Sequence, residues 1–382
     1  MVAGKITDLR VAMLRRALDH ARAAIPIVQE LDPTLQERLA NRVDRRIDEV
    51  RADLADIDRD DAATFNRLIG AGDELIEETL AFLAAAGVRR IGLDYGVTNL
   101  AMNWLDRLSD TAELPHVAVV IPAVAEFTGM VSSVVRLRVP LDGVWGLPVA
   151  VHEYGHFVAA NLTRRQEVEA TVRTVTPVED LLHHAATSAE LPQLYSHGHE
   201  LFADAFAAAT AGPAYSHYCL RYRFVPSAAR EATATHPPTV RRVRIQLAVL
   251  AVLANDDPSG YLSADLLALR ERWNAELAAA GVSSEVPVDR ELDQLESDIV
   301  SLVLEDRRLR RLRYSDHLSA CALAEAGLLA NGRPTVAHII NAAWCARAKI
   351  ERDVDDAEHV RSMLTDVAEL TSALLERVMT DG

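Results

Sequence analysis

The chain has 382 residues, of which 49% are hydrophobic, 25% charged and 5% aromatic. This composition is typical of a globular protein with a large core, and the low aromatic content together with abundant alanine favours helices over sheets. The 40 basic and 56 acidic residues give a formal net charge of −16. Such a charge argues against binding of nucleic acid or of an anionic membrane through the bulk surface.

The part of the chain before about residue 88 has the periodicity of amphipathic helices. "DPTLQERLANRVDRRIDEVRADL" (32–54) begins with an Asp-Pro helix start and spaces its apolar residues three and four apart. "DELIEETLAFLAAAGV" (73–88) places Gly87 where a helix would stop. No chemical motif falls in this part. We therefore expect a helical domain over residues 1–114, either a packed or partner-binding bundle or a cap that regulates access to a site.

The sequence changes character near residue 115. "HVAVVIPAV" (116–124) and "SSVVRLRVPL" (132–141) are rich in β-branched residues and predict two strands. "LDGVWGLP" (141–148) predicts a turn into a helix, short helices follow to about 245, and long helical patterns continue to about 378. We predict a mainly α-helical fold with a small β-sheet (α+β), whose core lies over 115–258 and is followed by a helical region over 259–382.

The sequence gives no signal for export or membrane insertion. The N-terminal segment lacks the uninterrupted apolar stretch of a secretory signal. The longest apolar stretches, 117–125 and 245–254, are shorter than the roughly 20 residues that a membrane span needs. Cys219, Cys321 and Cys345 have no paired spacing, which predicts neither a disulfide framework nor a thiolate metal site. We expect a soluble protein of the cytoplasm.

One apolar stretch, "LPVAVHEYGHFVAANL" (147–162), contains His152, Glu153 and His156. Residues four apart on a helix share a face, so the two imidazoles can converge on one zinc ion. Glu153 lies one position further round, where it can accept a proton from the water that the metal activates. The pattern predicts a zinc site. A helix whose two histidines make ordinary hydrogen bonds is the alternative.

A zinc site needs a third ligand, and the candidates lie downstream. In the helical pattern "ELFADAFAAATAGPAY" (200–215), Glu200 and Asp204 share a face. Glu200 can therefore ligate while Asp204 accepts a hydrogen bond from a ligand imidazole. The other candidates are Glu167, Glu169, Glu190, His197 and His199, of which the two histidines are the main alternatives to Glu200.

Three segments in order, "HEYGH" (152–156), "ELFAD" (200–204) and "THPPTVRRV" (235–243), resemble a known family. They are similar to the soluble part of the zinc metallopeptidases that include the CAAX prenyl endopeptidases and the HtpX-type heat-shock peptidases. The resemblance covers about 145 to 245 and implies a zincin-like core. By position, the resemblance implies that His152, His156 and Glu200 are the zinc ligands. It implies that Glu153 is the general base and that Asp204 is the hydrogen-bond partner of a ligand imidazole.

The third segment carries His236 and Arg242. The resemblance places both in the active site, and His236 is a candidate hydrogen-bond donor to the tetrahedral intermediate. Tyr215 and His217 are further candidates for that role. A local cap made by His236 at a turn into a helix is the alternative, and His183 and His184 are expected to cap or pack.

We therefore predict a zinc-dependent peptidase that acts on a peptide or protein. Family members usually carry membrane helices, which this sequence lacks, so prenylated or membrane substrates are not implied. An extended substrate could add to the strand within 134–141 as an edge. The helical flanks could bind a regulatory partner or form a homo-oligomer. The alternatives are a helical regulatory or interaction protein with a structural or vestigial zinc site, and a metallopeptidase that cleaves a regulator.

Overall fold

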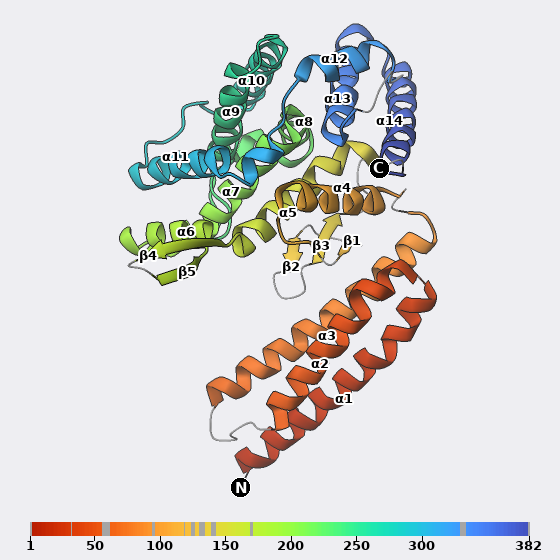
Figure 1. Cartoon of the computed structure of the whole chain (residues 1–382), viewed down its shortest axis with the longest axis vertical. Coiled ribbons are helices and arrows are strands. Elements are labelled where there is room, and N and C mark those ends of the chain that lie inside the picture. Colours follow the sequence, from red (N-terminus) through yellow and green to blue (C-terminus); the bar gives the residue numbers. More distant parts are fainter. Residues whose placement is uncertain are drawn as a thin grey trace. The chain divides into compact units, whose positions relative to one another are not determined.

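The computed structural model describes residues 2–31, 33–55, 62–93, 96–117, 119–123, 127–129, 134–138, 143–168, 171–328 and 334–380. The prediction of a mainly α-helical protein with little sheet is confirmed (Figure 1). The chain forms two compact units. The N-terminal unit is Met1–Thr98 with Ala118–Pro140, and the C-terminal unit is Asn99–Val117 with Leu141–Gly382.

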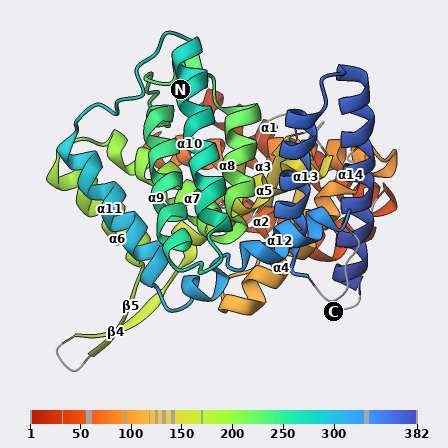
Figure 2. The same cartoon turned by 90° about the horizontal axis from the view of Figure 1, so that it is seen from above.

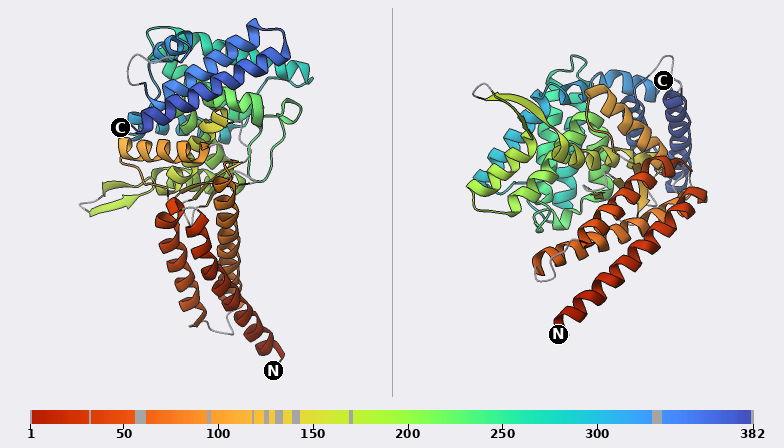
Figure 3. Two further views of the ribbon diagram at one scale, coloured as in Figure 1. Left: turned by 90° about the vertical axis from the view of Figure 1, so that its right-hand side faces the viewer. Right: turned by 60° about the horizontal axis from the view of Figure 1, so that its bottom comes forward.

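The N-terminal unit is built on three long helices that run side by side (Figure 3). They are α1 (Val2–Leu31), α2 (Pro33–Ala55) and α3 (Ala62–Arg90). Each contributes a stripe of apolar side chains to one core, such as Leu18, Ile47 and Phe82. Full burial of such a side chain stabilises a fold by roughly 1.5–3 kcal/mol, so the apolar periodicity of these segments accounts for the bundle.

A three-stranded sheet belongs to the same unit. Its strands are β1 (Val119–Ala123), β2 (Phe127–Gly129) and β3 (Val134–Arg138), in the order β1-β3-β2. β1 pairs with β3 in parallel, and β2 pairs with β3 antiparallel. Ile121 of β1 lies in the core formed by the helices.

These pairings correct one prediction. The expectation that the strand within 134–141 offers a free edge is wrong, because β3 is the central strand. It pairs with β1 over Val134–Arg138 and with β2 over Val134–Arg136. Periodicity identified the strand, but it carries no information about which strands pair with it. The division into units also differs from the three sequence-based regions, since the strands group with the N-terminal helices.

The C-terminal unit contains the remaining long helices and one antiparallel hairpin that the sequence did not predict. The hairpin strands are β4 (Arg164–Val168) and β5 (Thr171–Val175). The helices are α4 (Val97–Ala112, which begins at the boundary of the two units), α5 (Leu147–Asn161), α6 (Pro177–Ser188), α7 (Gln193–Ala211), α8 (Pro213–Tyr218), α9 (Thr239–Asn255), α10 (Tyr261–Ala279), α11 (Arg290–Glu305), α12 (His317–Glu325), α13 (Val336–Asp353) and α14 (Ala357–Thr380). Short helical turns lie at Gly143–Gly146, Cys219–Arg223, Pro226–Ala228 and Leu309–Leu312.

Helix α7 is the centre of this unit. It packs against α5, α6, α9 and α11, and Figure 2 shows it among α8, α9 and α10. Small residues allow the close approach to α5, because a Cβ atom at Gly155 would lie only 2.9 Å from the Cα atom of Ala203. In the described part of the chain, no helix combines the length and the apolar character needed to cross a membrane.

We predict that Gly155→Ala destabilises the C-terminal unit. Its methyl group meets the backbone of α7, which has little freedom to move, so the cost should be about 1–3 kcal/mol. Thermal unfolding followed by circular dichroism would measure this as a lower Tm. Gly87→Ala is the matched control, because nothing lies within 4 Å of its Cβ position in α3. It should be neutral or stabilising by up to about 1 kcal/mol. An unchanged Tm for Gly155→Ala would contradict the tight contact.

Candidate metal centre

The three residues predicted as zinc ligands lie together inside the C-terminal unit. His152 and His156 are one turn apart on α5, and Glu200 faces them from α7. His156 Nε2 lies 3.4 Å from Glu200 Oε1, and His152 Nε2 lies 3.7 Å from Glu200 Oε2. One ligand atom from each residue lies within 4.8 Å of the others. The tight packing of α5 on α7 therefore places two nitrogens and one carboxylate around a common point.

The chemistry of this donor set suits a divalent metal such as zinc, which binds imidazole nitrogen and carboxylate oxygen. Burial lowers the pKa of the His152 imidazole to about 4 against the opposing effect of Asp204, so the ring is neutral and can donate a lone pair. Among the described residues, the buried Glu200 Oε2 has no hydrogen-bond partner. Arg242 Nη2 lies 3.0 Å from it but is not aligned as a donor.

Charge is concentrated at the same point. Burial opposes ionisation of Glu200, yet Arg242 and the two histidines hold the pKa of this carboxyl well below its usual range. Burial also opposes the charged form of His156, but Glu200 outweighs it and raises the pKa of His156. The charged Glu200 carboxylate thus favours a proton on His156, and a divalent cation between the two side chains would interact favourably with the same negative charge.

Asp204 and Tyr215 hold the ring of His152. Asp204 is fully buried one turn after Glu200, and its Oδ1 lies 3.2 Å from His152 Nδ1. The Tyr215 hydroxyl, from α8, donates to Asp204 Oδ1 at 2.5 Å and lies 2.9 Å from His152 Nδ1. Burial and the nearby Asp204 raise the pKa of Tyr215 well above its ordinary value, so the hydroxyl keeps its proton. Contacts of this kind fix the orientation of a ligand imidazole.

Arg242 of α9 is committed to the two carboxylates. Its Nε and Nη2 donate to Asp204 at 2.6 Å and 2.9 Å, in a fork that matches the carboxylate. The guanidinium carbon also lies 5.4 Å from the centre of the Phe224 ring. Arg242 therefore lies in the site, as the resemblance implies, and acts as a positioning residue for Asp204 and Glu200.

His236 lies at the edge of the cluster. Its side chain is 47% exposed, and its Nε2 lies 3.5 Å from Glu200 Oε1. Its Nδ1 lies 2.8 Å from the Thr235 hydroxyl, and its backbone N–H donates to the Thr233 hydroxyl. His236 thus makes the contacts expected of a local cap at a turn. It also borders the site, as a donor to the tetrahedral intermediate must.

The remaining candidates have other partners. His197 Nε2 lies 2.9 Å from the Thr233 carbonyl, and His199 Nε2 lies 3.1 Å from Glu179 Oε1. His217 Nε2 contacts Asp265 at 2.9 Å. Exposed positions are occupied by His183, His184 and Glu190. Glu167 lies in β4, of which only the backbone is described, and Glu169 lies outside the described residues.

Tyr215 is the residue whose part in the site the sequence reasoning missed. The sequence suggests it only as a donor to the intermediate. Tyr215 follows the Gly212-Pro213 turn after α7, and this turn directs its side chain back towards the contact between α5 and α7. The direction of the side chain depends on the geometry of the turn, which the sequence pattern does not specify.

The chain has no match among protein-family models, curated protein sequences or solved structures. Assignment of the site therefore depends on its own residues and geometry.

We predict that Arg242→Gln destabilises the protein by about 3–5 kcal/mol, because it leaves the buried Asp204 carboxylate without its cation. Urea unfolding of the variant and the wild type measures the difference. Arg244→Gln, on the same helix, is the control and should cost at most about 1 kcal/mol. Arg244 is partly exposed and pairs with Asp293 and Glu296. Arg241 pairs with the same two carboxylates, so they keep a cation when Arg244 is replaced. Equal losses for the two variants would contradict the central place of Arg242.

Proposed function

We propose that this protein is a zinc-dependent hydrolase of the peptidase type, with His152, His156 and Glu200 as the ligands. The observation that carries the proposal is that ligand atoms of these three residues lie within 4.8 Å of one another. A buried carboxylate lies beside the two histidines on α5. That group is Glu153, whose side chain is buried at 3% exposure. A carboxylate one position after the first ligand histidine can accept a proton from a metal-bound water, which is the base that hydrolysis needs.

The proposed chemistry divides among the residues of this chain. Zinc held by the three ligands would supply a water whose pKa is lowered from about 15.7 towards 7. Glu153 accepts a proton from the attacking water and returns it to the leaving amine. Asp204 and Tyr215 keep the ring of His152 in place, and Arg242 keeps Asp204 and Glu200 charged and oriented.

His236 is the residue of this set that a substrate can reach, because its side chain is half exposed and borders Glu200. We assign it a hydrogen bond to the substrate carbonyl oxygen as negative charge develops there. The peptide or protein nature of the substrate comes from the resemblance of the three segments. A reducing, cytoplasmic location is part of the same proposal and is supported by the free thiols of all three described cysteines.

A structural or vestigial zinc site is the competing function. Structural zinc needs four protein ligands and leaves no position for water. The candidates for a fourth ligand are His197, His199 and His236. Within the described residues, His197 Nε2 lies 2.9 Å from the Thr233 carbonyl and His199 Nε2 lies 3.1 Å from Glu179 Oε1. His236 borders Glu200 but is half exposed, and it is assigned here to the substrate. This favours an open coordination position and therefore a catalytic site.

Metal analysis tests the ligand assignment. In His156→Ala, the loss of one of three ligands should remove the zinc that the cluster holds, which lowers the content by one ion per chain. His184→Ala is the control, since His184 is exposed on α6 away from the cluster and should leave the content unchanged. Equal zinc content in His156→Ala and the wild type would show that the cluster is not a zinc site.

Hydrolysis of a peptide library tests the general base. Glu153→Gln should retain the metal but lower kcat by about 100-fold or more, because the amide cannot accept the proton. Glu291→Gln, exposed at the start of α11, should behave as the wild type. Full activity of Glu153→Gln with zinc bound would reject Glu153 as the base. Absence of hydrolysis by the zinc-loaded wild type would favour the structural alternative.

A further inference from the structure

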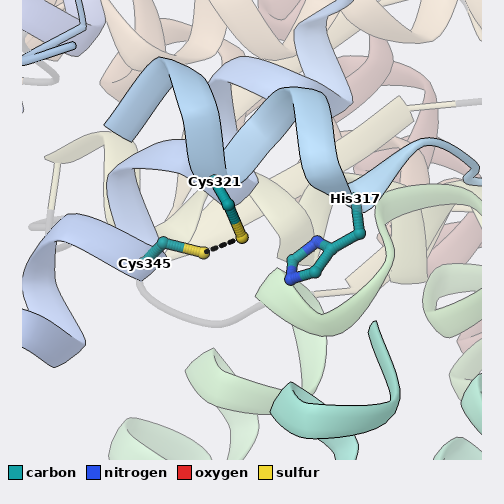
Figure 4. A group of neighbouring side chains, drawn as sticks. All are labelled: His317, Cys321 and Cys345. Carbon is teal, nitrogen blue, oxygen red and sulfur yellow. Dashed lines mark hydrogen bonds between the residues drawn. The ribbon is translucent and has the colours of Figure 1, made fainter. Parts of the chain in front are cut away.

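A second group of metal-binding side chains lies in the C-terminal helices. His317 and Cys321 are one turn apart on α12, and Cys345 faces them from the adjacent α13. One ligand atom from each lies within 4.8 Å of the others. Figure 4 shows the two sulfur atoms directed at each other with the imidazole ring beside them. The group shares no residue with the cluster on α5 and α7.

The spacing of the two sulfur atoms fits coordination to one ion. The Sγ atoms of Cys321 and Cys345 are 3.8 Å apart. Two thiolates bound to one zinc at about 2.3 Å each, at the tetrahedral angle, are also about 3.8 Å apart. A disulfide would bring them to about 2.05 Å. The packing of α12 on α13 therefore already holds both donors at the separation that a shared metal requires.

The surroundings of His317 suit a ligand. The ring is buried at 1% exposure, its Nδ1 lies 2.8 Å from the Tyr314 hydroxyl, and its Nε2 lies 3.5 Å from Asp265 Oδ2. Both nitrogens have a polar neighbour, so the nitrogen that does not ligate keeps a partner. Asp265 is held in turn by His217 at 2.9 Å. Carboxylates and hydroxyls behind a histidine are the usual outer contacts of metal sites.

We propose that His317, Cys321 and Cys345 bind a second metal ion between α12 and α13, and the softness of the donors favours zinc. Two thiolates and one imidazole favour zinc over calcium or magnesium, which take oxygen ligands. Among the described residues, no fourth Cys, His, Asp or Glu belongs to the group, and both thiols are only partly buried, so solvent can take the fourth position. The spacing of the cysteines does not predict this group, because Cys345 follows Cys321 by 24 positions and the contact forms only when the helices pack.

Titration of the reduced, metal-free full chain with Co²⁺ tests the proposal. Cobalt bound by thiolates has an intense sulfur-to-metal charge-transfer band in the near ultraviolet, which a histidine and carboxylate site cannot give. We expect this band to saturate by two added ions per chain in the wild type, where the first cluster also binds cobalt, and at one ion per chain in His156→Ala. It should be strongly reduced in Cys345→Ser. Cys219→Ala is the matched control, since this buried thiol lies outside the group, and it should keep the band.

The result is independent of the proposed hydrolase, because the first cluster contains no sulfur. If Cys345→Ser does not fold, Cys321→Ser provides the same readout. Absence of the band from the wild type with its thiols reduced would overturn the proposal. A band that survives both serine variants would also overturn it. So would a mass spectrum of the wild-type chain that shows the loss of two hydrogens, as in a Cys321–Cys345 disulfide, together with no bound metal.

Discussion

The buried carboxylate of Asp204 is the constraint on which the site depends. It is removed from water, and it is stabilised by the fork of Arg242 and by the hydroxyl of Tyr215. An uncompensated charge in such a position would cost several kcal/mol, so loss of one of these contacts should weaken the others. The same contacts set the ring of His152 and place Arg242 beside Glu200. Stability of the helical core and geometry of the ligand set therefore have one origin.

Small residues make this arrangement possible. Gly155 and Ala203 let α5 and α7 approach until their backbones nearly touch, and the two histidines and Glu200 then face one another across a short gap. Larger residues at this contact would separate the ligands without changing any of them. Glycine in a helix lowers its intrinsic stability, and here the close helix contact offsets that cost.

Sequence reasoning recovered what periodicity and spacing encode. The one-turn separation of His152 and His156, and that of Glu200 and Asp204, placed four side chains on two helix faces, and the structure brings those faces together. Contacts between distant segments were not recoverable. The central position of β3, the hairpin of β4 and β5, the return of Tyr215 and the approach of Cys321 to Cys345 all depend on pairings that no local pattern records.

The central claim is that two imidazoles and one carboxylate share a single ion. Anomalous diffraction from crystals of the zinc-loaded chain, recorded on both sides of the zinc absorption edge, tests it most directly. The account predicts an anomalous peak within bonding distance of His152 Nε2, His156 Nε2 and Glu200, with no fourth protein ligand. A map without a peak there, or with the position filled by another side chain, would contradict it.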